Sequence, residues 1–307
     1  MHCDTISECF QASSCFMEND LHVDVGRGSA YRPWVQVLAA WIPDTLRGEA
    51  AFEFCCDILD FAYNQAVVNS DCMQLVNTAE DLDAGMARKA CTAILAVEGG
   101  AALGGEIRRL DDLARRSVKV ITLTWNGENE LGYGCGCEGK EQCGLTPFGK
   151  TVIKQMERQR MIPDVSHLNQ GGFWDVAETV SCPFIASHSV SAAVHTHARN
   201  LTDAQFDEIC RRGGLVGLNL CESQLGEQSF ERFEKHLDHF LSRGGERCLG
   251  LGCDMDGTDL PSEWGGIQSM EKLFDYLCRK NYDEQLLDRL FFGNCYDFFH
   301  QALTTKE

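Results

Sequence analysis

Residues 161–189, MIPDVSHLNQGGFWDVAETVSCPFIASHS, contain two short apolar runs that each end beside a serine–histidine pair. The runs are Met161–Val165 and Pro183–Ser187, and an amphipathic stretch separates them. Each run is too short for an independent helix, so we interpret both as buried β-strands. The stretch therefore predicts a strand–helix–strand unit with a histidine at the carboxyl end of each strand.

The same alternation of short apolar runs and amphipathic stretches extends over most of the chain. Nearly continuous hydrophobic strands separated by helices are typical of a parallel sheet that is buried on both faces. The first four residues, Met1–Asp4, provide a very short eighth strand candidate. We therefore predict an α/β fold in which residues 1–307 form a single (β/α)₈ TIM barrel. The remaining predicted strands are Val35–Ile42, Cys91–Val97, Val118–Trp125, Leu215–Leu220 and Cys248–Cys253.

Local signals also place several helices. Thr146 and Pro147 supply a cap and a first-turn proline for a helix that runs to about Arg160. Thr202 and Gln205 form a capping box at the start of the next clear helix. Residues 9–32 lack clean periodicity and predict a long loop with a short helix. Further helical candidates are Phe206–Arg212, Phe230–Arg243, Ile267–Lys280 and Glu284–Leu303.

Charge and apolar content exclude several classes of protein. The chain has 27 Lys and Arg against 46 Asp and Glu, a formal net charge of −19. This balance argues against a nucleic-acid or anionic-membrane partner, since both are negatively charged and bind proteins with excess positive charge. No apolar stretch approaches the ~20 residues of a membrane span, and no N-terminal segment indicates export. The 17 cysteines are therefore expected to be mostly reduced and buried in a cytoplasmic protein.

Side chains that bind metal ions recur at the predicted carboxyl ends of the strands. In a (β/α)₈ barrel this end holds the active site, because the loops converge there. His2 and Asp4 are two residues apart on a strand and so point the same way. Each residue alone has an ordinary explanation as a turn or structural residue, but together they favour a site for an ion such as Zn²⁺. The other members of the set are Glu98, His167, His188 and Asp254.

In these motifs the chain resembles the membrane (renal) dipeptidase family of binuclear zinc peptidases, which are amidohydrolase-like barrels. The resemblance runs from His2 to the C-terminus. It suggests a soluble, bacterial-type member of the family. It rests on six motifs in order: HCDT (2–5), VEGG (97–100), DVSH (164–167), SHS (187–189), ARN (198–200) and GCDMDG (252–257).

The resemblance implies a ligand set for two zinc ions per chain. His2 and Asp4 would bind one ion, and His167 and His188 would bind the other. Glu98 would bridge the two, a task that suits a carboxylate with two oxygens.

The resemblance also implies how a dipeptide is held. Arg199 would bind the C-terminal carboxylate of the substrate, where a guanidinium can donate two parallel hydrogen bonds. Asp254 would face the free amino group. Binding of both charged ends, by Arg199 and Asp254, would restrict the enzyme to dipeptides.

The predicted function is zinc-dependent hydrolysis of dipeptides that have a free amino group and a free carboxylate. The attacking group would be a hydroxide that bridges two metals, because two nearby ions lower the pKa of a shared water toward ~7. Glu98 and Asp254 are the predicted catalytic residues, with Asp254 as a candidate proton carrier. A lactonase or cyclic amidase with the same metal site, and a catalytically degenerate binding protein, remain open alternatives. Family members are often homodimers, so a homodimer is expected by analogy.

The sequence departs from the family pattern at two places. Mammalian members have a substrate-contacting His after the fourth strand, and here Trp125 takes that place. An indole N–H donates one hydrogen bond but carries no charge. Asn126 or Trp125 therefore substitutes in substrate binding, or substrate preference and rate differ. Only Met1 precedes His2, so the first strand is expected to be short.

A separate candidate site lies in the glycine-rich loop after the fourth strand. Cys135, Cys137 and Cys143 could hold a structural zinc, although they offer only three thiolates at a nonstandard spacing. The remaining histidines that we considered are interpreted as loop or packing residues: His195, His197, His236 and His239.

Overall fold

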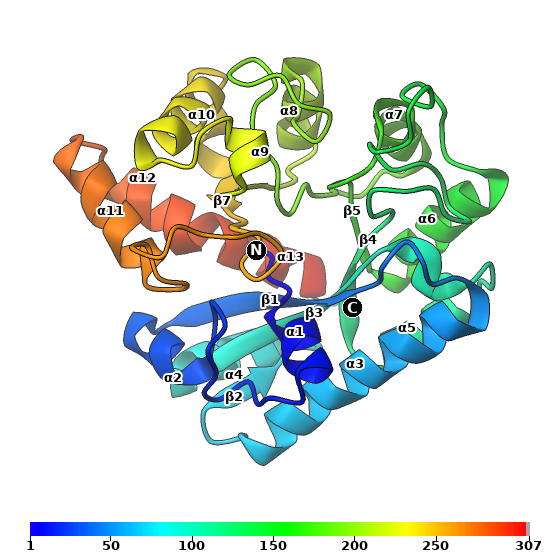
Figure 1. The fold of residues 1–307 in the computed structure, drawn as a ribbon, viewed down its shortest axis with the longest axis horizontal. Helices are drawn as coiled ribbons and strands as arrows, with labels where there is room; N and C mark the ends of the chain where they lie inside the picture. The colour runs from blue at the N-terminus through cyan, green and yellow to red at the C-terminus, as the bar shows by residue number, and fades with distance from the viewer. Residues whose placement is uncertain (305–307) are drawn as a thin grey trace.

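The computed structural model describes residues 1–304 and is an α/β fold built on parallel strands (Figure 1). One sheet has the order β1-β3-β4-β5, and β2 pairs with the first half of β3. A second parallel sheet consists of β6 and β7. The strands are β1 (Trp34–Trp41), β2 (Met73–Leu75), β3 (Cys91–Glu98), β4 (Val118–Thr122), β5 (Ile162–Asp164), β6 (Val216–Leu218) and β7 (Leu249–Leu251).

Single bridges lie between the two sheets. Ile185 pairs with the end of β5, and Ala186 pairs with the start of β6. On the other side, Cys3 pairs with Met255, which follows β7. The carbonyl of Cys3 also accepts a hydrogen bond from the N–H of Ala39 in β1, at 3.0 Å. The first residues of the chain therefore lie between β1 and the segment after β7.

The predictions for the strands are confirmed only in part. Pro183–Ser187 and Met1–Asp4 are wrong as strands, because they contribute only bridge residues. Pro183 has no N–H to give to a ladder. After Asp4, helix α1 (Thr5–Gln11) begins at once and ends the extended conformation. The other six predicted strands are present, and strand β2 was not predicted. The described residues form two sheets rather than one continuous eight-stranded ladder.

Helices lie around the strands in Figure 1, and the N-terminus lies near the middle of the view. The predicted caps are present: Thr146 accepts from the N–H of Gly149, and Thr202 and Gln205 form a capping box. The predicted helix 284–303 is divided by a π-helical turn, Arg289–Gly293. The other helices are α2 (Val25–Gly28), α3 (Gly48–Val68), α4 (Ala79–Arg88), α5 (Arg109–Arg115), α6 (Pro147–Gln159), α7 (Gln170–Thr179), α8 (Asp203–Arg211), α9 (Glu222–Leu225), α10 (Phe230–Ser242), α11 (Ser269–Arg279), α12 (Glu284–Asp288) and α13 (Asn294–Leu303).

The core is formed by the strands and the inner faces of these helices. All eight residues of β3 are buried, as expected for a strand in the middle of a covered parallel sheet. Cys3, Cys55 and Cys253 are buried, as the sequence predicts for most of the cysteines. Cys210 in α8 and Cys248, the residue before β7, form a disulfide, and this pair was not predicted. Among the residues described, no helix is long and apolar enough to cross a membrane.

Candidate metal centre

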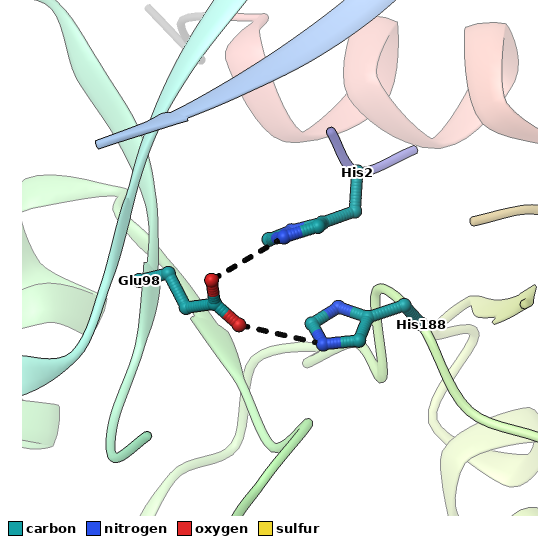
Figure 2. Close-up of side chains that lie close together, drawn as sticks. All are labelled: His2, Glu98 and His188. Atoms are coloured by element: carbon teal, nitrogen blue, oxygen red, sulfur yellow. Dashed lines mark ion pairs between the residues drawn. The ribbon is translucent and has the colours of Figure 1, made fainter. Parts of the chain in front are cut away.

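Four buried site residues from distant parts of the sequence lie close together, three of them at or just beyond the carboxyl end of a strand or bridge. Glu98 is the last residue of β3, and His167 follows β5 by three residues. His188 follows the bridge residue Ala186, and His2 lies just before α1. Figure 2 shows His2 and His188 on the same side of the Glu98 carboxylate, one above the other, with one ion pair from each to that carboxylate. Parallel strand ends thus bring together residues that are far apart in the sequence.

Both oxygens of Glu98 face histidine nitrogens. Its Oε1 lies 2.9 Å from Nε2 of His167 and 3.4 Å from Nε2 of His188, and its Oε2 lies 3.5 Å from Nε2 of His2. Burial alone would raise the pKa of Glu98, but the positive charge of His2 holds that pKa well below its usual range. This carboxylate therefore stands between two groups of possible ligands, where a bridging residue would have to lie.

His167 and His188 direct unprotonated Nε2 atoms at one another. Nδ1 of His167 lies 3.0 Å from Oδ1 of Asn126, and an amide oxygen only accepts, so Nδ1 carries the proton. Burial, with the positive charge of Arg199, lowers the pKa of His167 to about 4. Burial, with the charges of His2 and Arg199, also lowers the pKa of His188. Two neutral imidazoles thus present lone pairs 2.9 Å apart.

The second group of possible ligands contains His2, Asp4 and Asp254, whose ligand atoms all lie within 4.8 Å of one another. Burial alone would lower the pKa of His2, but the negative charges of Glu98 and Asp4 raise it well above its usual value. Burial and the charge of Glu98 raise the pKa of Asp4 to about 8 and that of Asp254 to about 6. Nε2 of His2 and Oδ1 of Asp4 are buried and have no hydrogen-bond partner in the part of the chain that the structure describes.

These observations test whether the residues fit metal ions. The buried Nε2 lone pairs of His167 and His188 face each other without a proton between them. The carboxylates of Asp4, Glu98 and Asp254 also lie close enough together that the charge of Glu98 raises the pKa values of both aspartates. Both features are costly unless a cation compensates them. Imidazole and carboxylate are ligands that Zn²⁺ accepts. The residues therefore fit divalent metal binding.

The backbone at the site is unusual. His167, Asp254 and Asp256 have positive φ angles of 65°, 56° and 67°. Positive φ angles are uncommon for residues other than glycine, and they cluster at functional sites. Gly257 has no space for a side chain, because an added Cβ would lie 2.4 Å from both Oδ1 of Asp254 and Oδ2 of Asp4.

Arg199 is a buried cation, and the residue is only 8% exposed. Among residues 1–304, neither Nη1 nor Nη2 of Arg199 has a hydrogen-bond partner. Its backbone N–H donates to Nδ1 of His197 at 3.2 Å. A buried guanidinium with free donors is ready to bind an anionic group.

Trp125 and Asn126 lie on the His167 side of the site. The Trp125 ring packs edge-on against Trp41 at 5.0 Å and lies 6.4 Å from the His167 ring. Asn126 contacts His167 directly, a contact that the sequence analysis did not predict. Sequence reasoning also missed Asp164 and Ser187, which lie behind His188. The only signal for them was their place in the DVSH and SHS motifs.

The residues interpreted as non-ligands have ordinary contacts. His236 is fully buried and lies between the backbone N–H of Ser191 and the carbonyl of Leu225. His239 lies 2.8 Å from Asp203. Within residues 1–304, the groups that could hold a metal do not include Cys135, Cys137 or Cys143.

Comparisons with known proteins agree with this geometry. The family model described as membrane dipeptidase (peptidase family M19) matches residues 1–307. A protein from the pqqA 5′ region of Klebsiella pneumoniae is 32% identical over 233 residues, which cover 72% of this chain and 86% of that protein. The crystal structure of dipeptidase AC, a metallopeptidase of family M19, has a TM-score of 0.92 at 25% identity and covers 99% of this chain and 98% of its own. A metallopeptidase from Rhodobacter sphaeroides, with a phosphinate mimic of L-Ala-D-Ala bound, has a TM-score of 0.91 at 24% identity and covers 98% and 97% of the two chains.

Proposed function

Because the chain belongs to the membrane dipeptidase family of metallopeptidases, we propose that it is a zinc-dependent dipeptidase with two metal ions per chain. The substrates are dipeptides with a free amino group and a free carboxylate. The observation that carries this proposal is the convergence of three histidines on the two oxygens of Glu98. A further part of the proposal is that the two sheets and their bridge segments close into one (β/α)₈ barrel, with residues 1–307 as a single domain.

The residues divide into two sets of metal ligands. His167 and His188 would hold one ion, His2 and Asp4 would hold the other, and Glu98 would be a ligand shared by both. When bound, the ions supply Lewis acidity and lower the pKa of water, so that a nucleophile is available at neutral pH. The hydrogen bond from His167 to Asn126 keeps Nε2 unprotonated and free to bind.

The substrate is held at its two charged ends. Arg199 binds the carboxylate through Nη1 and Nη2, which lack partners within the described residues. Asp254 faces the α-ammonium group and carries the proton from the attacking water to the leaving nitrogen through its carboxylate. Its Oδ1 lies 3.7 Å from Nε2 of His2, so this carboxylate borders the ligand set. Trp125 packs between Trp41 and His167. Trp125 and Asn126 contact the substrate on this side of the site.

Metal analysis joined to a dipeptide panel tests the proposal. The panel contains L,L-dipeptides, L-Ala-D-Ala and their N-acetylated and C-amidated forms. We expect two zinc ions per chain, and chelator-sensitive release of amino acids only from dipeptides with both ends free. Protein that holds two ions and leaves the panel intact would contradict the proposal.

A second candidate is a hydrolase for lactones or cyclic amides, and the observation that favours it is the neutral Trp125 beside His167. Equal turnover of substrates with and without free charged ends would support this candidate. Equal turnover would also leave the unpartnered Arg199 guanidinium without a role.

A further inference from the structure

The carboxylate of Asp164 is fully buried and accepts four hydrogen bonds. Oδ1 accepts from the backbone N–H groups of Ser166 and Ser187, at 3.0 and 2.9 Å. Oδ2 accepts from the hydroxyl groups of Thr122 and Ser187, at 2.6 and 2.5 Å. A buried carboxylate is costly unless its lone pairs are used, and here all of them have donors. Asp164 is therefore held in one orientation at the end of β5.

Ser187 connects this carboxylate to a proposed metal ligand. A hydroxyl group has one proton, and Ser187 gives it to Oδ2 of Asp164. The Ser187 oxygen, 2.8 Å from Nδ1 of His188, must then accept at that contact. Nδ1 of His188 therefore carries the imidazole proton, and Nε2 keeps the lone pair that faces Glu98.

The backbone of His188 is fixed by the same group of residues. Its N–H donates to Oγ of Ser166 at 3.0 Å, and Oγ of Ser166 lies 3.3 Å from Oγ of Ser187. Ser166 thus holds the main chain of His188, and Ser187 holds the ring at Nδ1. Nε2, the nitrogen proposed to bind the metal, takes no part in these contacts. All of these residues are buried.

We infer that Asp164 and Ser187 are positioning residues that fix the tautomer and the direction of His188 for metal binding, an inference that rests on the proposed function. A carboxylate behind a histidine ligand orients the ring and increases the basicity of the nitrogen that binds the metal. His167 has a neutral amide, Asn126, in the equivalent place. Of the two histidines proposed to bind this ion, only His188 is therefore connected by hydrogen bonds to a carboxylate.

The test measures metal binding independently of turnover. Wild-type protein is stripped with a chelator and titrated with Co²⁺, whose visible absorption reports the ligand geometry. A competing chelator gives the affinity. Ser187→Ala removes the relay, and we expect the Co²⁺ affinity of one ion per chain to fall about 10- to 100-fold. Ser187→Thr keeps the hydroxyl group and is expected to restore the affinity and the spectrum.

Two further variants separate positioning from stability. Asp164→Asn keeps the size of the side chain but places an amide N–H where Ser187 donates, so it is expected to resemble Ser187→Ala. Thr122→Val removes one hydrogen bond to Asp164 without touching Ser187. We expect it to lower the melting temperature of the stripped protein and to leave Co²⁺ affinity unchanged. The ¹⁵N chemical shifts of the His188 ring in stripped protein report the tautomer directly. They should show Nδ1–H in wild type and a mixture in Ser187→Ala.

The outcomes distinguish failure of the proposed function from failure of the positioning role. Wild-type protein that binds no metal would overturn the proposed function. Wild-type protein that binds two ions and cleaves dipeptides, with a folded Ser187→Ala of equal Co²⁺ affinity, would overturn the positioning role alone. A loss of affinity in Thr122→Val as large as that in Asp164→Asn would also overturn it. If Ser187→Ala does not fold, Asp164→Asn and the wild-type tautomer decide the question in the same way.

Discussion

The Nε2 atoms of His167 and His188 lie 2.9 Å apart, and neither has a proton to donate to the other, because each ring carries its proton on Nδ1. Asn126 accepts the proton of one ring and Ser187 accepts the proton of the other. Oε1 of Glu98 lies within 3.4 Å of both nitrogens. Three buried lone pairs at one point oppose folding unless a cation lies among them.

Metal removal should therefore destabilise the protein as well as inactivate it. A ligand at 1,000 times its dissociation constant stabilises the folded state by about 4 kcal/mol. We expect the melting temperature to fall by about 8 °C or more after chelation, since 1 kcal/mol corresponds to about 2–4 °C for domains of this order of size. Differential scanning fluorimetry with and without a chelator, followed by Zn²⁺ addition, measures the effect. Equal melting temperatures for loaded and stripped protein would contradict the site.

Replacement of Arg199 should weaken substrate binding more than it slows the chemical step. Arg199→Ala removes a charge-assisted pair of hydrogen bonds, worth about 1.5–3 kcal/mol, so KM should rise about 10- to 100-fold. The matched control is a dipeptide amide used as an inhibitor, since it lacks the carboxylate that Arg199 would bind, and its inhibition constant should differ little between wild type and variant. A large fall in kcat with unchanged KM would instead place Arg199 in the chemical step.

The general location of the site could be predicted from the sequence, because strand-end polar residues in an α/β protein have few places to lie. His2, Glu98 and His188 were identified from motifs, and the structure brings them together. The capping box at Thr202 also follows from local chemistry, since three residues are enough to form it.

Features that depend on several distant segments could not be predicted. Bridge segments such as Ile185–Ala186 look like strands in sequence, but whether a ladder continues depends on the neighbouring backbones. The link from Asp164 to His188 depends on the rotamer of Ser187, which no periodicity reveals. The disulfide between Cys210 and Cys248 joins residues 38 positions apart, and with 17 cysteines the sequence could not single out this pair.

Gly257 offers a test of the second group of ligands. An alanine Cβ at this position would lie 2.4 Å from carboxylate oxygens of both Asp4 and Asp254, far below normal contact distance. We expect Gly257→Ala to displace these carboxylates and to lower the metal content from two ions toward one per chain. Gly293→Ala is the matched control, because its Cβ would meet nothing closer than 3.6 Å. Metal content measured by atomic emission should be unchanged in the control, and two ions in both variants would refute the assignment.

His236 should make the protein sensitive to acid for a reason unrelated to the metals. Burial lowers its pKa from 6.5 to about 4 in the folded protein. Nδ1 accepts the N–H of Ser191, and Nε2 donates to the carbonyl of Leu225, so a second proton at Nδ1 would oppose the Ser191 N–H. Between pH 6.5 and about 4 the unfolded chain binds a proton at His236 that the folded protein does not. The contribution of His236 to stability is therefore complete above pH 6.5, declines as the pH falls, and is lost by about pH 4.

The expected size of this loss is about 3 kcal/mol, since each unit of pKa difference corresponds to about 1.4 kcal/mol. Urea unfolding of wild type and His236→Gln at pH 7 and pH 4.5 measures it. The variant is less stable at pH 7 because it loses buried hydrogen bonds, but its stability should fall less on acidification. His239→Gln on the same helix, where the ring lies beside Asp203 at the surface, is the control for the loss of an imidazole. Parallel curves of unfolding free energy against pH for wild type and His236→Gln would show that His236 is not the group responsible.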